Sequence, residues 1–143
     1  MRRNHALVIG DQTAEAIKIK IGSATKLSRE ESMSVKGRDT VTGLPRTVNL
    51  TSNDVYQALS KPLAQIVGVV KAVLEETPPE LAADIIDRGI VMSGGTSLLR
   101  NLDVLITREV GVPAYLAEEP LLCVVKGTGK AMEHIDVYRK TVR

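Results

Sequence analysis

Aromatic residues and cysteines are scarce in this sequence. It contains no Phe and no Trp, and its aromatic residues are three Tyr in 143 residues. It therefore lacks a platform on which nucleic-acid bases stack, and it lacks the aromatic belt of a membrane protein. Cys123 is the one cysteine, which excludes an internal disulfide, and His5 and His134 are too far apart in the sequence for metal-ligand spacing. A reducing cytosol is the expected environment, and no metal site is predicted.

An excess of one charge and a long apolar run are also missing. The chain carries 19 Lys and Arg against 17 Asp and Glu, a net charge of +2, and the basic residues are scattered. This distribution makes nucleic acid a poor candidate partner. The N-terminal stretch holds four consecutive apolar residues, Ala6 to Ile9, too few for a signal peptide or a membrane span. We expect nothing in the chain to export it or to embed it in a membrane.

Hydrophobic residues make up 43% of the sequence, enough for a core built from Ile, Leu, Val and Ala. In the first half, Ile17 and Ile21 are four residues apart and Gly22 follows, which favours a helix over residues 12–21. The alternation of Ile17, Ile19 and Ile21 suits a strand equally well. The segments MSVKGRD and PRTVNLT, joined by TVTGL, then predict a β-hairpin with a loop of about five residues.

A long helix is predicted after the hairpin. Thr51 or Ser52 is placed to cap it, and the apolar residues that follow recur at three-and-four spacing. Pro62 lies near the middle of this helix and should kink it or split it in two, because proline lacks the N–H that the helix needs.

The dipeptide at Pro78 and Pro79 is the clearest break in the chain, since proline can open a helix but cannot continue one. We place a subdomain boundary there, between residues 1–77 and 78–143. Beyond it, helix and strand patterns alternate, which predicts an α/β unit with a parallel sheet and covering helices. The predicted elements are a short helix at 79–86, a strand at 89–93, a helix at 97–110, a strand at 113–117 and a helix at about 128–140.

The stretch GIVMSGGTSLLRNL, residues 89–102, has the pattern of a buried strand that meets two glycines and restarts as a helix. Such a turn leaves backbone N–H groups at the positive end of a helix dipole, which favours an anionic or polar ligand. The missing side chains of Gly94 and Gly95 let a flat ring approach the backbone, and Thr96 or Ser97 would cap the helix. Double glycines at strand-helix turns also serve packing alone, and the stretch matches neither the dinucleotide fingerprint nor a phosphate-binding loop.

No catalytic residue is predicted. Glu118 and Glu119 are adjacent, so their side chains do not face one another, and His134 has no recognisable acid or nucleophile partner. We interpret Gly127 and Gly129 as a tight strand-helix corner that opens the last helix, with a second close approach to the backbone as the alternative.

Four stretches together resemble one protein family. They are TAEAIKIKIGSA, KGRDTVTGLPRT, TPPELAADIIDRGIVMSGGTSLLRNLD and GKAMEHID. With these in view, residues 1 to 138 resemble the C-terminal part of the bacterial actin homologues of the MreB/Mbl family. The resemblance implies an actin-like fold of the ASKHA, ribonuclease H-like class, in which ATP binds in a cleft between two lobes. Residues 1–77 would be the small outer subdomain of the second lobe, and residues 78–143 the later part of its large subdomain.

The resemblance also implies a nucleotide site. Two short segments fall on family positions that surround the adenosine, one on the loop that approaches it and one on the outer-subdomain helix that lines the base and ribose. The family commonly has three glycines at the position of this loop, whereas actin itself has a turn similar to the one in this chain. The loop residues here are Gly94, Gly95, Thr96 and Ser97, and the helix residues are Glu15, Ala16, Ile17 and Lys18.

Several parts of the family's catalytic machinery do not occur in these 143 residues. They are the two hairpins that hold the phosphates and magnesium, and the first lobe with its membrane-inserting segment and the residues that position the attacking water. Hydrolysis needs clamped phosphates, a metal and a placed nucleophile together. We therefore expect no ATPase activity from this chain alone. Its binding of ATP or ADP, which the intact family protein holds with Mg²⁺, should be weak or absent.

The resemblance finally implies a biological setting. Members of the family form nucleotide-dependent filaments that govern cell shape and wall synthesis, and these filaments are cytoplasmic and membrane-associated. The expected partners are further copies of the protein, the missing N-terminal lobe and proteins of the cell-shape and wall-synthesis complex, with membrane contact only through absent regions. Two alternatives stay open: a stand-alone truncation that caps or modulates full-length filaments, and a small nucleotide-using enzyme built on residues 78–143.

Overall fold

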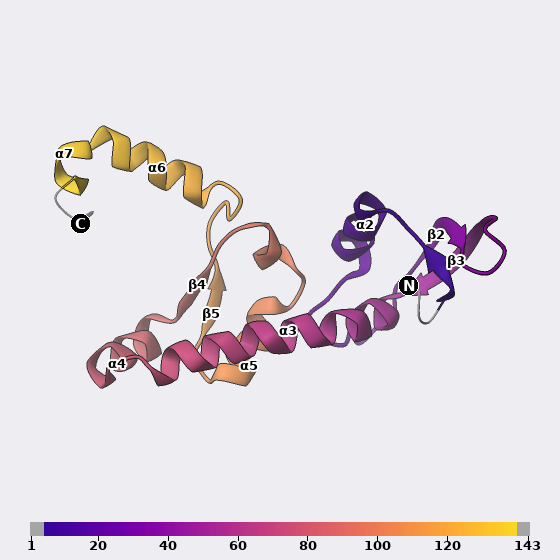
Figure 1. Cartoon of the computed structure of the whole chain (residues 1–143). Coiled ribbons are helices and arrows are strands. Elements are labelled where there is room, and N and C mark those ends of the chain that lie inside the picture. Colours follow the sequence, from indigo (N-terminus) through magenta and orange to yellow (C-terminus); the bar gives the residue numbers. More distant parts are fainter. Residues whose placement is uncertain (1–4, 140–143) are drawn as a thin grey trace.

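The computed structural model describes residues 5–139. Its elements form two units, and one long helix runs along both (Figure 1). The first unit contains an antiparallel sheet of three strands, and the second contains a parallel pair of strands. In chain order the elements are β1 (Leu7–Val8), α2 (Asp11–Ile21), β2 (Ser32–Asp39), β3 (Pro45–Thr51), α3 (Ser52–Glu75), α4 (Pro79–Arg88), β4 (Ile90–Met92), the 3₁₀ helix η1 (Gly95–Leu98), α5 (Leu102–Val110), β5 (Ala114–Leu116), α6 (Cys123–Glu133) and α7 (Ile135–Tyr138).

The first unit is built around one small core. Strand β2 pairs antiparallel with both β1 and β3, and residues 40–44 form the predicted hairpin loop, so the hairpin is confirmed. Helix α2 packs through Ile17 and Ile21, which are 4% and 2% exposed, whereas Ile19 is 73% exposed. The two buried residues are one helical turn apart, so the ambiguous alternation belongs to a helix. The core of this unit consists of Leu7, Ile17, Ile21, Val35 and Leu50.

Helix α3 starts at a predicted cap and continues through proline. Thr51 Oγ1 accepts a hydrogen bond from the Asp54 N–H at 3.3 Å, and Asp54 Oδ2 accepts one from the Thr51 N–H at 3.0 Å, which together form a capping box. The predicted split at Pro62 is wrong, because α3 is one helix over Ser52–Glu75. Pro62 and Ala58 are both exposed, so water can satisfy the Ala58 carbonyl that Pro62 leaves without a helical partner.

The second unit confirms the predicted parallel pairing. Strands β4 and β5 run parallel with Ile90 opposite Ala114, and α5 packs beside β5. The core of this unit takes Ala24 from the segment that follows α2. Its other buried members are Leu63, Val67, Leu102, Leu105, Ile106 and Ala114.

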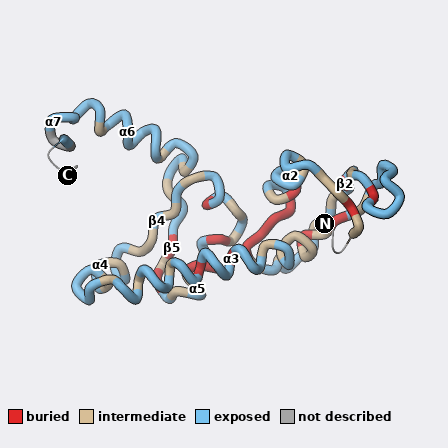
Figure 2. The backbone as a smooth tube through the Cα atoms, viewed as in Figure 1, coloured by how far each residue is buried: buried red, intermediate tan, exposed pale blue. Residues whose placement is uncertain are grey.

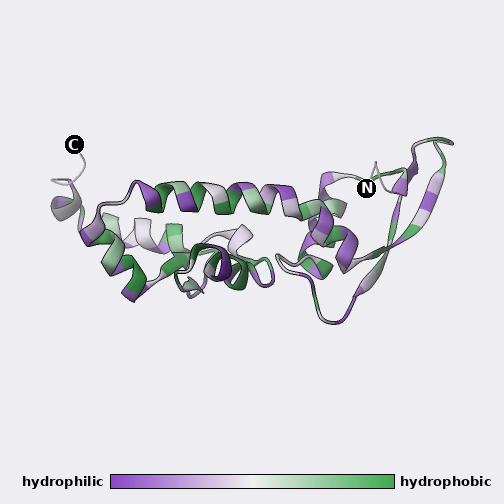
Figure 3. Cartoon of the chain, turned by 90° about the horizontal axis from the view of Figure 1, so that it is seen from below, coloured by the Kyte–Doolittle hydropathy of each residue, from purple (hydrophilic) through white to green (hydrophobic). Residues whose placement is uncertain are grey.

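Helix α3 belongs to both units by its packing. Val55, in its first half, packs against the core of the first unit, whereas Leu63 and Val67 are buried in the core of the second. Figure 3 shows α3 extended beside both units, and Figure 2 shows that α4 and α6 contribute no buried segment. The division into residues 1–77 and 78–143 stays a prediction, and α3 couples the two parts physically.

The helix predicted over residues 97–110 differs in the structure. Its first residues belong to η1, and α5 starts only at Leu102. Asn101 lies between the two helices with φ 61°, a left-handed conformation that a continuous right-handed helix excludes. The apolar periodicity of this stretch gave no sign of that interruption.

The last helix also begins elsewhere than predicted. Helix α6 starts at Cys123 rather than near residue 128, and α7 follows it, while residue 140 of the predicted helix lies outside the described residues. Gly127 and Gly129 are therefore interior residues of α6, and their interpretation as a corner is wrong. Glycine weakens a helix without forbidding it, by about 1 kcal/mol per residue relative to alanine.

Asp39 organises the tip of the hairpin. One carboxylate oxygen accepts hydrogen bonds from the N–H groups of Val41 at 2.8 Å and Thr42 at 3.0 Å, and the other accepts from Arg46 Nη1 at 2.8 Å. The Thr42 N–H has the largest effect, followed by Arg46, and together these donors lower the pKa of Asp39 from 3.8 to about 2. The loop so held presents Val41 and Leu44, which are 86% and 66% exposed.

The hairpin tip should loosen only at strongly acidic pH, because the Asp39 carboxylate that holds it must first be protonated. Because the pKa of Asp39 is lower in the folded chain than its ordinary 3.8, its stabilising contribution is fully present above that value and is lost as pH falls toward 2. Carboxyl shifts followed by NMR should give a midpoint near 2 for Asp39. Asp39→Asn should remove the acid-dependent loss of amide protection in residues 41–44. A midpoint at 3.8 in the intact chain would contradict the assignment.

Gly22, directly after α2, should tolerate no side chain. A Cβ at this position would lie 2.2 Å from the Lys18 carbonyl oxygen, so Gly22→Ala must displace the backbone and should cost about 1–3 kcal/mol of unfolding free energy. Gly10→Ala, at the other end of α2, is the matched control, because a Cβ there meets nothing within 4 Å. Because Gly10 is the N-cap residue of α2, where alanine is less favourable than glycine, we expect the control to cost less than Gly22→Ala, about 1 kcal/mol or less in urea unfolding. Equal destabilisation by both variants is the result that would refute this expectation.

Candidate functional site

Two hydrogen bonds hold the glycine turn between β4 and η1, one within the turn and one to Pro120. Gly94 has φ 84°, which residues other than glycine rarely adopt, and its N–H donates to the Pro120 carbonyl at 2.8 Å. The Ser97 hydroxyl donates to the Gly94 carbonyl at 2.6 Å. The predicted helix cap at Thr96 or Ser97 is therefore wrong: Ser97 closes the turn, and the residue at the cap position of α5 is Asn101.

Gly95 and Thr96 form the exposed part of this turn. A Cβ at Gly95 would contact Leu121 Cδ2 at 3.4 Å and nothing else within 4 Å, so the backbone there is open to approach. The helix that follows is η1, of four residues, and α5 begins only at Leu102, so the expected helix dipole does not act at the turn. What the turn offers a ligand is a bare backbone surface and the Thr96 hydroxyl.

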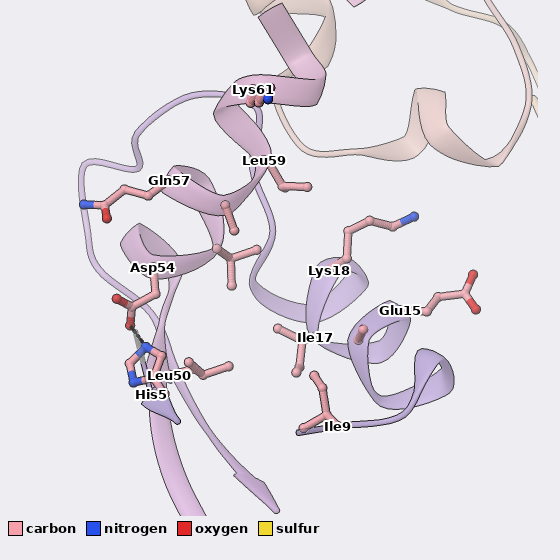
Figure 4. Close-up of a pocket in the computed structure, with 13 residues that line it drawn as sticks. His5, Ile9, Glu15, Ile17, Lys18, Leu50, Asp54, Gln57, Leu59 and Lys61 are labelled. Atoms are coloured by element: carbon pink, nitrogen blue, oxygen red, sulfur yellow. Dashed lines mark ion pairs between the residues drawn. The ribbon is translucent and has the colours of Figure 1, made fainter. Parts of the chain in front are cut away.

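The four site residues predicted on the helix lie in the middle of α2 with different exposures. Glu15 and Ala16 are exposed, Lys18 is partly buried, and Ile17 is 4% exposed. In Figure 4, Ile17 points toward α3, whereas the charged ends of Glu15 and Lys18 point away from it. Ile17 therefore anchors α2 in the core of the first unit, and its three neighbours are the side chains that can meet a polar ligand.

The two predicted segments are joined through the residues that follow each of them. Ser23, after α2, forms a parallel β-bridge with Arg100, after η1. The Ala24 N–H donates to the Arg100 carbonyl at 2.8 Å. Within residues 5–139 no hydrogen bond directly links residues 15–18 to residues 94–97. The helix and the turn are thus held together at their ends, not through the site residues themselves.

A pocket of about 880 Å³ lies between α2 and α3 (Figure 4). Apolar side chains point into it from both helices and from the strands beside them, among them Ile9, Ile17, Leu50 and Leu59. Residues 94–97 do not line it, whereas Glu15, Ile17 and Lys18 do, so the pocket shares the α2 side of the predicted site but not the glycine turn. The polar side chains around it are His5, Glu15, Lys18, Asp54, Gln57 and Lys61.

A contact between His5 and Asp54 that sequence reasoning missed lies at one end of this pocket. His5 Nε2 is 3.7 Å from Asp54 Oδ2, and this nitrogen is buried without a hydrogen-bond partner in the described chain. The Thr51 N–H, helped by the Thr51 hydroxyl and by His5, lowers the pKa of Asp54. The spacing of Thr51 and Asp54 was a readable signal for the capping box. The pairing with His5 is a tertiary contact that no local pattern reveals.

The described residues give no sign of metal chemistry or of a membrane span. Within residues 5–139, no cluster of three or more His, Cys, Asp or Glu side chains is placed to hold a metal ion. None of the described helices combines the length and apolar character needed to cross a membrane. Glu119 precedes Pro120, whose carbonyl accepts the hydrogen bond from the Gly94 N–H, and it forms an ion pair with Lys126.

Known proteins show a consistent similarity to this chain. Residues 1–140 match the family described as MreB/Mbl protein. The cell shape-determining protein MreB of Escherichia coli strain K12 is 49% identical over 138 residues, which cover 96% of this chain and 40% of that protein. The cell shape-determining protein Mbl of Bacillus subtilis strain 168 is 48% identical over 136 residues, which cover 95% of this chain and 41% of that protein. This chain therefore spans about two fifths of the length of these relatives.

Solved structures extend the similarity to the fold. The crystal structure of MreB 5 of Spiroplasma citri bound to AMPPNP matches with a TM-score of 0.90 and 36% identity, covering 98% of this chain and 42% of that one. A MamK double helical filament matches with a TM-score of 0.64 and 22% identity, covering 84% and 36%, which shows a likeness of fold alone. The fold is the actin-like fold of these proteins, and the assignment to the second lobe stays a prediction.

The family itself is not in doubt. The family match extends over nearly the whole chain, and sequence identity to several relatives is close to one half. The assignment of this chain to the C-terminal part of the family protein stays a prediction. The predicted family is confirmed: this chain belongs to the MreB/Mbl family.

Proposed function

We propose that this chain is part of a filament-forming, ATP-binding cytoskeletal protein and that it supplies the adenosine side of the nucleotide site. The observation that carries the proposal is the match, at a TM-score of 0.90 over 98% of the chain, to a family member in a crystal structure bound to AMPPNP. A structure of MreB5 of Spiroplasma citri bound to ADP matches with the same score over 97% of the chain. The names of the relatives add a role in determining cell shape.

In this proposal the chain is the C-terminal part of the family protein and forms most of its second lobe. The unit with the antiparallel sheet is then the small outer subdomain, and the unit with the parallel strands is the later part of the large subdomain. Two observations support the assignment: the hairpin and the parallel pair lie in separate sheets, and each has its own core.

The proposed adenosine slot lies between the glycine turn and the outer surface of α2. The bare backbone at Gly95 gives a flat ring room to approach, and the small side chain of Ala16 leaves room on the helix side. Lys18 supplies donors, Glu15 supplies acceptors, and the Thr96 hydroxyl can do either. These groups suit a nucleoside, which is flat and carries both donors and acceptors, better than they suit a bare anion.

The triphosphate and magnesium require residues from outside this chain. The family's two phosphate-binding hairpins do not occur in these 143 residues. Phosphate contacts supply the charge-assisted hydrogen bonds that make nucleotide binding tight. We therefore propose ATP and ADP with Mg²⁺ as ligands of the intact protein, with weak or absent binding and no hydrolysis by this chain alone.

Self-association along a filament is part of the same proposal. Exposed apolar side chains support it: Val41 and Leu44 at the hairpin tip, and Val124 and Val125 on α6, which are 76% and 63% exposed. The proposed partners are further copies of the protein, the first lobe and proteins of the cell-shape and wall-synthesis complex, and the proposed setting is cytoplasmic, membrane-associated filaments.

Adenosine and ATP should bind this chain with similar affinity. Because the proposed contacts reach the base and ribose and not the phosphates, both dissociation constants should be about millimolar in an NMR titration. The backbone signals of residues 94–97 and 15–18 should shift together during the titration. Much tighter binding of ATP, or shifts confined to the pocket between α2 and α3, would contradict the proposed slot.

Gly95→Ala should weaken adenosine binding without unfolding the chain. The added Cβ meets only Leu121 at ordinary contact distance, and Gly95 is not among the glycines with positive φ, so the fold should accept it. The methyl group would occupy the surface that the ring approaches, and we expect a loss of affinity of about tenfold. Gly68→Ala, on α3, is the matched control because a Cβ there meets nothing within 4 Å and the residue lies outside the proposed slot. Equal losses in both variants would show that the turn is not the site.

A further inference from the structure

A polar contact with Ser23 buried at its centre joins the two walls of the proposed slot at their ends. It consists of Ser23, Thr25, Arg100 and Asn101, and we refer to these four residues as the joint. Ser23 pairs with Arg100 in a parallel β-bridge and is fully buried. The Arg100 carbonyl accepts hydrogen bonds from the Ala24 N–H at 2.8 Å and from the Ser23 hydroxyl at 3.3 Å. These bonds bring the segment after α2 against the segment after η1.

Asn101 adds the side-chain part of the joint. Its Nδ2 donates to Thr25 Oγ1 at 3.0 Å and to Ser23 Oγ at 3.3 Å. Its φ of 61° is a left-handed conformation that Asn tolerates better than most residues do. Asn101 is thus the N-cap residue of α5, and its side chain also holds the segment after α2.

The Arg100 side chain also bonds directly to the last turn of α2. Its Nη2 donates to the Lys20 carbonyl, in the last turn of α2, at 3.2 Å. Its Nη1 donates to Glu31 Oε1 at 2.7 Å. The contact with Lys20 places a positive group at the C-terminal end of a helix, where the helix dipole favours it. The ion pair with Glu31 is largely exposed and should add little to stability.

The joint lies very close to both walls along the chain. Helix α2 ends at Ile21, two residues before Ser23, and η1 ends at Leu98, two residues before Arg100. Short connections leave little freedom between the joint and each wall. The two units are also connected through α3, which packs against both cores, and through Ala24, which is buried in the second core. The joint is the hydrogen-bonded connection that lies nearest to both walls.

We propose that the joint sets the separation between α2 and the glycine turn, and that Ser23, Thr25, Arg100 and Asn101 are positioning residues for the adenosine contact. The second clause rests on the proposed function, whereas the first concerns the protein alone. A slot held at fixed width is organised before the ligand arrives, so less of the binding free energy is lost to ordering its walls.

The separation can be measured without a ligand. Cys123→Ser removes the native thiol, and cysteines at Ile19 and Leu98, which are 73% and 51% exposed, carry spin labels on the two walls. Asn101→Gly keeps the left-handed backbone and removes both side-chain bonds, so its distance distribution by pulsed electron paramagnetic resonance should broaden. Asn101→Asp is the rescue variant: the Thr25 hydroxyl can donate to its carboxylate while the Ser23 hydroxyl keeps its bond to the Arg100 carbonyl, and the narrow distribution should return.

An unchanged distribution in Asn101→Gly would overturn the proposal. If that variant does not fold, Thr25→Val takes its place, because it removes the 3.0 Å bond while keeping the volume of the side chain. Broadening in Thr25→Val then supports the joint as a spacer, and a distribution as narrow as that of the parent chain refutes it. Thermal unfolding of each variant separates a loosened joint from a globally unstable chain.

Adenosine titration then connects the joint to the slot. We expect Asn101→Gly to weaken binding by about three- to tenfold, the effect of losing one or two hydrogen bonds, with Asn101→Asp close to the parent chain. Gly95→Ala should differ from Asn101→Gly by losing affinity while keeping a narrow distance distribution. If the parent chain binds no adenosine, the predicted millimolar binding to the slot fails, and the distance measurement still decides whether the joint fixes the separation.

Discussion

Helix α3 is the element on which the rest of the structure depends, because its side chains complete both hydrophobic cores. Val55 packs with the first core, and Leu63 and Val67 are buried in the second. Each core is small, and neither sheet has more than three strands, so each unit needs the surface that α3 supplies. Continuity through Pro62 is therefore essential: tertiary packing on both sides outweighs the loss of one helical hydrogen bond at an exposed position.

Attachment to α3 alone would leave the two units free to move relative to one another on the side away from α3. The joint around Ser23 and Asn101 supplies the second attachment, between the segment that follows α2 and the segment that follows η1. Ala24 adds an apolar anchor, since it is 2% exposed and packs in the second core although it follows α2 in the chain. Packing through α3 and hydrogen bonding through the joint together define the relative positions of α2 and η1.

Much of this architecture was predictable because it depends on local periodicity. The spacing of Ile17 and Ile21, the two hairpin segments and the alternation of helices and strands after Pro79 gave elements that the structure confirms. The parallel pairing of β4 and β5 followed from the helix between them. Family membership was predictable for a different reason: specific sequence blocks carried it, and the comparisons confirm it.

What could not be predicted depends on contacts between distant residues. The apolar pattern of residues 97–110 suits one helix, but Asn101, which bonds to Ser23 and Thr25, is left-handed and lies between η1 and α5. In the same way, the hydroxyl of Ser97 was available as a cap, yet it closes the glycine turn. The proposed site residues were placed by resemblance, and their role stays a prediction because the polar bonds near them connect protein to protein.

If the slot holds adenosine, its affinity depends on geometry fixed in advance by these bonds, since uncharged contacts with a base are individually weak. Contacts between the phosphates and the rest of the protein would then supply most of the affinity. The nucleotide would bind tightly only where both halves of the site meet.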